Sequence, residues 1–395
     1  MKVIEGCPYF GLNKEKIKSY PYLNGDISCD ILIVGGGVDG AVANYFLSQN
    51  YDVVLVDKAR LGMGCSARAT CLLEYQLDGF ASELKSYLSE AQIVDIYRAG
   101  LNGISKLEGL EKSLGESIGF ARRPSFLFSN SIFDKKKIFD ESKFRKQNGL
   151  HCEVFTRQDN PFNFQAKFGL FAENGGAEVD PYLLCKALIE KSKNQDTIFE
   201  YTKVESLSKT GKEFVCQTTY GYKIYCKEVI LATGFDFLLA RQADACKRFV
   251  SYSIVTNPLK SLRWQKDALV QDCLSPYHYM RFLPDDRIIF GGEDTPLKGD
   301  IDKSLARKKY DKLLKDLKKL FPQEKEIRAE FEFCGGFGTT KNNMGLVGRD
   351  KDGLIYFFSC GANGIVNSMM GIEIIEEILN GKTHPLEKIF SPMRE

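Results

Sequence analysis

Residues 30–40, which read DILIVGGGVDG, decide the fold. The apolar run 30–34 predicts a short buried strand of a parallel sheet. It leads directly into G-x-G-x-x-G, with glycines at 35, 37 and 40. A helix is predicted over 41–50 and a second strand over 53–56, which ends at Asp57, 22 positions after Gly35. Strand, glycines, helix, strand and acid in this order predict a dinucleotide-binding α/β unit.

Each part of this unit has a physical role in binding a dinucleotide. Gly35 permits the tight turn, Gly37 lets the backbone approach a pyrophosphate, and Gly40 lets the helix pack closely on the strand. Free N–H groups at the helix start, around Val38, bind the diphosphate oxygens. Asp57 accepts hydrogen bonds from ribose hydroxyls. The alternative is a glycine-rich loop that binds no ligand.

The stretch after the acid helps to choose between two dinucleotides. Residues 58–73 read KARLGMGCSARATCLL, in which small and hydroxyl-bearing residues dominate. An NAD dehydrogenase more often continues into another crossover helix. A loop rich in Gly, Ser and Ala favours backbone that lies against a large flat ligand, and therefore FAD over NAD.

Composition limits the class of protein. The chain has 395 residues, 44% of them hydrophobic and 27% charged, which excludes a disordered or fibrous chain and predicts two to three domains. Its 54 basic and 52 acidic residues give a net charge of +2, so no basic excess predicts nucleic-acid binding. The N-terminus lacks the apolar region of a secretory signal. The uncharged stretch 353–372 contains several glycines and predicts a strand, loop and helix, not a membrane span.

Cysteine and histidine usage predicts a cytoplasmic protein without a metal site. The twelve cysteines are scattered and none forms C-x-x-C. We interpret them as reduced, mostly buried thiols of a cytoplasmic protein. The three histidines are far apart in the sequence, so we do not expect a His-based metal site.

Four segments together resemble the D-amino-acid oxidase family of FAD-dependent oxidoreductases, which includes glycine oxidase and sarcosine oxidase. They are the fingerprint with the loop 64–73, then 176–181 followed by 202–205, then 228–234, and finally the tail 342–348 with 359–365. The resemblance implies non-covalently bound FAD. Besides the fingerprint residues, the FAD contacts that it implies are Lys58, Gly64, Cys65, Ser66, Ala69, Thr70, Leu72, Val204, Thr233, Gly234, Gly361, Ala362, Asn363, Gly364 and Ile365.

The spacing of these segments predicts a discontinuous architecture. The fold class is α/β with an α+β substrate part: a Rossmann-like FAD-binding domain of the glutathione-reductase type, with an inserted antiparallel-sheet substrate domain. We assign 1–80, 151–235 and 331–395 to the FAD domain, and 81–150 and 236–330 to the substrate domain. In the inserts, helices are predicted over 82–114 and 303–320, and strands over 120–129, 251–256 and 287–291.

Residues 277–294 are similar to the family's Tyr-x-Arg strand and the Gly-Gly-x-Asp turn after it. On a strand, Tyr277, Tyr279 and Arg281 share one face, where two hydroxyls and a guanidinium meet one ligand. Arg281 would bind a substrate carboxylate in a two-point fork. The alternative is that Arg281 pairs with an acid and the tyrosines pack in the sheet. Tyr252 is a further pocket candidate, whereas His278 points to the opposite face and is interpreted as structural.

Two departures weaken the transfer of a substrate from the family. Val366 stands where many sarcosine oxidases have a Lys that holds the substrate carboxylate, and residues 343–345 replace the family's Asp-Gly-x-Pro. Cys334 lies near the region where some relatives attach flavin covalently, but a buried free thiol is the preferred interpretation.

The favoured function is oxidation of the C–N bond of an amino acid or other small amine by hydride transfer to flavin N5, with hydrolysis of the resulting imine. Oxygen, a quinone or a partner protein would then reoxidise the flavin. One alternative is an alcohol dehydrogenase of the glycerol-3-phosphate type, which needs several cations around a phosphate. Another is a flavin-bearing subunit without its own turnover. An NAD dehydrogenase is disfavoured by the loop 64–70 and by the tail.

Overall fold

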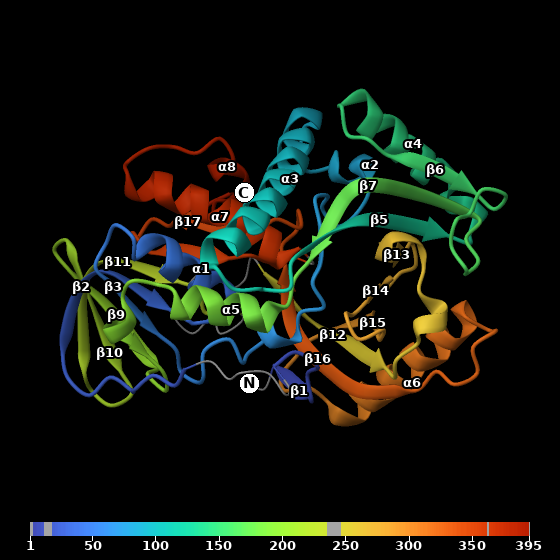
Figure 1. Ribbon diagram of the computed structural model, residues 1–395. Coiled ribbons are helices and arrows are strands. Elements are labelled where there is room, and N and C mark those ends of the chain that lie inside the picture. The colour runs from blue at the N-terminus through green and yellow to red at the C-terminus, as the bar shows by residue number, and fades with distance from the viewer. Residues whose placement is uncertain (1–2, 12–17, 235–245, 362, 395) are drawn as a thin grey trace.

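The computed structural model describes residues 3–11, 18–234, 246–361 and 363–394. Ala362, one of the predicted FAD contacts, lies outside the described residues. Within them the chain forms one eight-stranded and one ten-stranded sheet. Figure 1 shows the two sheets side by side, with α3 (Glu90–Leu114) rising beside the place where they meet.

The eight-stranded sheet has a parallel centre. Its order is β17-β18-β11-β2-β3-β8, and a hairpin of β9 and β10 joins at β11. β2 pairs in parallel with both β3 and β11, and β11 pairs in parallel with β18. The strands are β2 (Ile27–Val34), β3 (Val53–Val56), β8 (Ile198–Phe199), β9 (Val204–Thr210), β10 (Glu213–Thr218), β11 (Lys223–Leu231), β17 (Leu346–Arg349) and β18 (Ile355–Phe358).

The apolar runs of β2 and β3 are explained by burial on both faces of this sheet. Ile31 and Ile33 belong to a core shared with the helices α1 (Val38–Leu47), α5 (Pro181–Glu190) and α7 (Gly364–Leu379). Leu32 and Val34 belong to a second core with side chains of β10 and β11. Alternate residues therefore face opposite layers, as expected of a doubly covered parallel sheet.

The ten-stranded sheet is almost entirely antiparallel. Its order is β1-β16-β12-β15-β14-β13-β5-β7-β4, with β6 on β7, and only β13 and β5 pair in parallel. The strands are β1 (Ile4–Gly6), β4 (Leu72–Glu74), β5 (Ala121–Ser129), β6 (Glu153–Thr156), β7 (Phe168–Glu178), β12 (Lys247–Thr256), β13 (Leu269–Asp272), β14 (His278–Phe282), β15 (Ile288–Pro296) and β16 (Ala329–Thr339).

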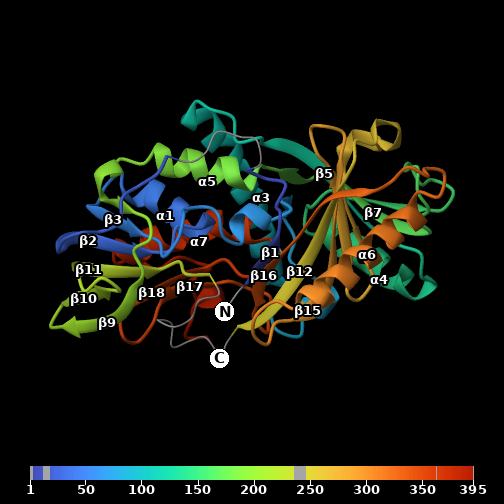
Figure 2. The ribbon, with the colours of Figure 1, turned by 90° about the horizontal axis from the view of Figure 1, so that it is seen from below.

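Helix α6 (Lys303–Leu320) covers one face of this sheet, beside β12 and β15 (Figure 2). It spans the predicted residues, and Leu313 and Leu317 on its apolar stripe are fully buried. They pack into a core with Phe164, Trp264 and other aromatic side chains. The opposite face of β12, β14 and β15 is thereby left to face the other sheet.

Two boundaries differ from the sequence predictions. The helix expected over 82–114 is broken into α2 (Ala81–Leu84) and α3, because Ser89 caps a new helix by accepting a hydrogen bond from the Gln92 N–H at 3.3 Å. The ranges 151–235 and 331–395, predicted for the FAD part, contain β7 and most of β16, which pair in the ten-stranded sheet. The remaining helices are α4 (Lys135–Gln147) and α8 (Glu387–Phe390).

Among the described residues, no helix is both long enough and apolar enough to cross a membrane. Within 353–372, β18 and the start of α7 form where a strand and a helix were predicted.

Candidate active site

A cavity of about 1100 Å³ lies between the two sheets. The fingerprint, the loop after β3, the tail before α7 and the free face of the ten-stranded sheet all line it. The predicted FAD contacts that line it are Gly35, Gly37, Val38, Asp57, Lys58, Gly64, Cys65, Ser66, Ala69, Thr70, Leu72, Val204, Thr233, Gly234, Gly361, Asn363, Gly364 and Ile365.

The fingerprint glycines make the turn from β2 into α1 possible. Gly35 has a φ of +109°, and a Cβ there would lie 2.4 Å from the Ala232 carbonyl oxygen. A Cβ on Gly40 would lie 1.7 Å from the Gly35 carbonyl oxygen. Gly40 does not line the cavity, so its role is the close packing of helix on strand.

The Asp57 carboxylate accepts hydrogen bonds from the turn between β2 and α1 and from the loop after β3. Its Oδ2 accepts from the Gly36 N–H at 2.7 Å and its Oδ1 from the Ala59 N–H at 2.7 Å. Burial raises the pKa of Asp57, although these two hydrogen bonds act in the opposite direction. Each carboxylate oxygen has a second lone pair, so the group can still accept from ribose hydroxyls.

Two polar side chains order the start of α1. Ser66 Oγ accepts from the Val38 N–H at 2.9 Å, which brings the loop after β3 onto the helix N-terminus. Asp39, which our sequence reasoning missed, accepts from the Ser359 N–H at 3.0 Å and from the Ser368 hydroxyl. It joins the first turn of α1 to the tail. The available sequence pattern was an acid two positions before the predicted helix, inside G-x-G-x-x-G.

The tail is tied to the strand opposite it by Asn363. Its Oδ1 accepts from the Glu74 N–H at 3.0 Å, and its Nδ2 donates to the Gln76 carbonyl at 2.7 Å. Gly364 and Ile365, which begin α7, line the cavity. The partial positive charge of a helix N-terminus therefore lies at the cavity wall, where it favours an anionic or carbonyl oxygen.

These features fit a flavin dinucleotide. A Cβ on Gly64 or Gly234 would meet nothing within 4 Å, so the backbone there borders open space. Thr233 Oγ1 is buried and has no hydrogen-bond partner in the described chain, although Thr233 lines the cavity. Buried polar atoms normally have a partner. A polar ligand beside Thr233 would supply it.

Tyr279 of β14 and Tyr277, just before this strand, lie at another part of the wall. Their rings are 5.9 Å apart, and the Tyr279 hydroxyl is 2.8 Å from Ser251 Oγ. Gly291 on β15 leaves room for the Tyr279 ring, because a Cβ there would lie 2.4 Å from it. Burial raises the pKa of Tyr279 to about 12 and that of Tyr277 well above 10. Both phenols therefore stay protonated and can donate hydrogen bonds near neutral pH.

Three acids at this end were not predicted. Glu74, Asp78 and Asp294 all line the cavity. Asp294 belongs to the Gly-Gly-x-Asp turn quoted above, so the motif was visible in the sequence. Its position facing Tyr279 depends on the pairing of β14 with β15, in which Tyr279 is opposite Gly291.

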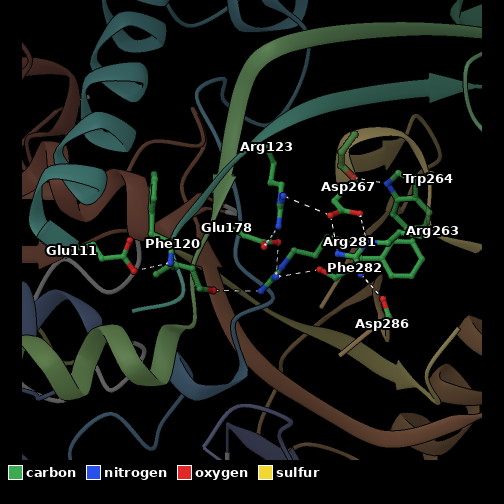
Figure 3. A network of polar contacts seen from close by, with 12 residues as sticks. Glu111, Phe120, Arg123, Glu178, Arg263, Trp264, Asp267, Arg281, Phe282 and Asp286 are labelled. Carbon is green, nitrogen blue, oxygen red and sulfur yellow. Dashed lines mark hydrogen bonds and ion pairs between the residues drawn. The ribbon is translucent and has the colours of Figure 1, made fainter. Parts of the chain in front are cut away.

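The prediction that Arg281 binds a substrate carboxylate is wrong. Arg281 does not line the cavity, and it is only 2% exposed. Its Nη1 donates to Glu178 Oε2 at 2.9 Å and its Nε to the Thr70 carbonyl at 2.8 Å. Figure 3 shows it beside Glu178, which Arg123 also contacts at 2.7 Å. Arg281 lies two residues after Tyr279, on the same face of β14. At that position Glu178 and the loop at Thr70 cover the face. Arg281 therefore positions the predicted flavin loop.

The prediction that Tyr252 lines the pocket is also wrong. Ser251 and Ser253 line the cavity, so Tyr252, between them on β12, points to the other face. It is 1% exposed there, and its hydroxyl is 2.8 Å from Thr295 Oγ1. His278 likewise points away from the cavity, with Nδ1 2.9 Å from Asp272 Oδ2.

The chain is similar to oxidoreductases in sequence and in structure. A family model described as FAD dependent oxidoreductase matches residues 30–377. Gamma-glutamylputrescine oxidoreductase of Escherichia coli (strain K12) is 22% identical over 94% of this chain and 88% of its own length. Glycine oxidase of Bacillus subtilis (strain 168) is 22% identical over 89% of this chain and 93% of its own. The crystal structure of glycine oxidase from Geobacillus kaustophilus superimposes with a TM-score of 0.79 at 19% identity, covering 93% of this chain and 99% of that chain.

Proposed function

The chain belongs to the FAD dependent oxidoreductase family, and from this premise we propose that it oxidises the C–N bond of a small amine or amino acid. The observation that carries the proposal is the single cavity in which the dinucleotide fingerprint and the Tyr277–Tyr279 wall meet. The names of two relatives, gamma-glutamylputrescine oxidoreductase and glycine oxidase, support the same substrate class.

We assign the cofactor contacts as follows. Backbone N–H groups at the start of α1 would hold the diphosphate, Asp57 would accept from the ribose, and the N-terminus of α7 would favour negative charge on the flavin ring. The bound flavin supplies the acceptor for a hydride from the carbon next to nitrogen. We propose non-covalent binding, since Cys334 is 1% exposed in the core beneath α6 and does not line the cavity.

The protein residues orient the amine for the reaction. Tyr277 and Tyr279 form an aromatic wall, and Ser251 fixes the Tyr279 phenol. The C–H bond breaks with its electron pair, the nitrogen loses a proton, and a C=N bond forms. Water then adds to that bond and an amine leaves. Holding the reacting carbon in place is the main contribution of such a wall.

The alcohol alternative is less supported by the site. A phosphate-bearing alcohol needs converging cations, but Glu74, Asp78 and Asp294 line the cavity at the tyrosine end. Arg281 does not serve a phosphate either, because Glu178 already neutralises it.

The test is anaerobic reduction of the FAD-loaded protein by candidate amines. Amino acids, N-methyl glycines and diamines are added in turn while flavin absorbance is followed. Bleaching by any of them supports amine oxidation. Bound flavin that is bleached by glycerol 3-phosphate alone, or by nothing, contradicts it and favours the alcohol or subunit alternative. Readmitting oxygen, or adding a quinone, then identifies the electron acceptor.

A further inference from the structure

Three carboxylates from two separate segments converge beside the two tyrosines. Glu74 ends β4, Asp78 lies in the turn after it, and Asp294 lies on β15, more than 200 positions away in the sequence. All three line the same cavity as Tyr277 and Tyr279, and all three lie close enough to Tyr277 for their charges to raise the pKa of its phenol. The fold therefore brings negative charge to the end of the cavity that we assign to the substrate.

Two of these acids form no direct ion pair in the described chain, although Arg145 acts on Glu74, and His278 on Asp294, from behind. Glu74 is 9% exposed, and in the described chain neither Glu74 nor Asp294 forms an ion pair. Asp294 Oδ1 is also buried without a hydrogen-bond partner among the described residues. Burial raises the pKa of Glu74 to about 7 and that of Asp294 to about 6. A buried carboxylate of this kind is stabilised by an arriving cation.

The basic side chains on the cavity wall have other positions or partners. Lys58, Arg60 and Lys203 lie near Asp57 and Val204, at the end assigned to the dinucleotide. Arg68 donates to the Met63 and Gly64 carbonyls at 3.1 and 3.2 Å. Arg248 is an exposed residue at the start of β12.

Resting on the amine-oxidising function proposed above, we infer that the substrate is an aliphatic diamine or polyamine without a carboxylate on the reacting carbon. Glu74, Asp78 and Asp294 hold its distal ammonium group. Tyr277 and Tyr279 flank its methylene chain, and the reacting C–N bond extends toward the flavin. An α-amino acid is disfavoured, because its carboxylate would meet these acids with Arg281 already paired to Glu178.

The charge of the pocket makes binding depend on pH. The titratable groups that face it are Glu74, Asp78, Asp294 and the two tyrosines, with Glu293 and His278 behind Asp294 and Arg145 behind Glu74. The tyrosines stay neutral, whereas Glu74 and Asp294 lose protons between about pH 5 and pH 8. Affinity for a dication therefore rises over that interval.

The experiment compares ligand classes on the FAD-loaded protein under anaerobic conditions. 1,4-Diaminobutane is titrated against butylamine and D-alanine, with flavin bleaching and calorimetric dissociation constants as two separate readouts. We expect the diamine to bind at least about 10-fold more tightly than either of the others, and more tightly at pH 8 than at pH 5.5. The variants Asp294→Asn and Glu74→Gln each weaken diamine binding about 10-fold and leave butylamine binding unchanged. Asp311→Asn, on the exposed side of α6, is the matched control.

The outcomes separate the two proposals. If D-alanine or another amino acid bleaches the flavin better than the diamine, the substrate inference is overturned and amine oxidation stands. If no amine of any class bleaches bound flavin, the proposed function itself fails. If the diamine bleaches the flavin but both variants bind it as wild type does, the acids do not hold the ammonium and the inference is overturned. Asp78→Asn replaces either variant that does not fold, as judged by its melting curve.

Discussion

The two ends of the cavity are built differently. The dinucleotide end consists largely of main chain from one contiguous stretch, 35–70, whose turn depends on Gly35 and Gly40. The other end consists of side chains from β4, β12, β14 and β15 that only strand pairing brings together. The main chain at the dinucleotide end is specified by a local sequence motif. The side chains at the other end meet only if the strands pair in the correct register.

The largest effect, a loss of FAD affinity, is expected at the dinucleotide end from Gly40→Val. Its Cβ would lie 1.7 Å from the Gly35 carbonyl oxygen, so the helix must move away from the turn. We expect FAD affinity to fall by up to about 100-fold, since overpacking of this kind costs up to ~3 kcal/mol. FAD content per chain and fluorescence titration measure it. Gly109→Ala in α3, where the added Cβ meets nothing within 4 Å, is the control and should bind FAD normally.

Arg281→Met tests whether this residue belongs to the framework or to the substrate wall. Removing one partner of the buried ion pair leaves the Thr70 carbonyl without its donor and Glu178 with Arg123 alone. We expect a loss of about 3 kcal/mol in the free energy of unfolding.

Urea denaturation measures this loss, and KM values for amino acids and for amines should change by the same factor. Arg122→Met removes an exposed pair with Glu108 and should leave the free energy of unfolding close to the wild-type value. A selective rise in KM for carboxylate substrates, with wild-type stability, would return Arg281 to the substrate site.

Glu74→Gln tests the charge on the side-chain wall through the pH dependence of stability. Burial raises the folded-state pKa of Glu74 from 4.5 to about 7, so the stability that it contributes is lost as pH rises through this interval. The variant lacks this loss and should gain up to about 3 kcal/mol over wild type at pH 8, and close to nothing at pH 4.5.

Urea midpoints at several pH values measure this gain. Glu90→Gln, at an exposed carboxylate whose pKa Lys85 lowers, should show no such gain at pH 8. An equal stability difference at both ends of the pH range would mean that Glu74 is not the group that titrates.

The smallest effect is expected from Tyr279→Phe, which removes one hydrogen bond within the wall. The 2.8 Å contact with Ser251 Oγ is worth about 1 kcal/mol. Ser251→Ala should cost a similar amount, and the double variant should cost less than the sum of the two. Additive losses in chemical denaturation would show that the two hydroxyls act independently.

The same difference decides how far the site could be predicted from sequence. Gly35 and Gly40 follow from a local motif, and the alternation of β14 predicted that Tyr277 and Tyr279 share a face. Alternation did not reveal that Glu178 of β7 covers that face at Arg281. Tyr252 was assigned to the wrong face of β12, and Asp294 became informative only once β15 was paired with β14. These relations depend on partners distant in the sequence, which periodicity does not encode.

Asp39 has a consequence for the order of synthesis. Its carboxylate accepts from the Ser359 N–H, 320 positions away, and Ile230 and Leu231 of β11 pair with Ile355 and Tyr356 of β18. A ribosome finishes the fingerprint early, yet the groups that bind the Asp39 carboxylate emerge about 320 residues later. Until then Asp39 has none of these partners. Nascent chains should therefore begin to retain FAD only after the tail has left the exit tunnel, which makes cofactor retention a late checkpoint of biogenesis.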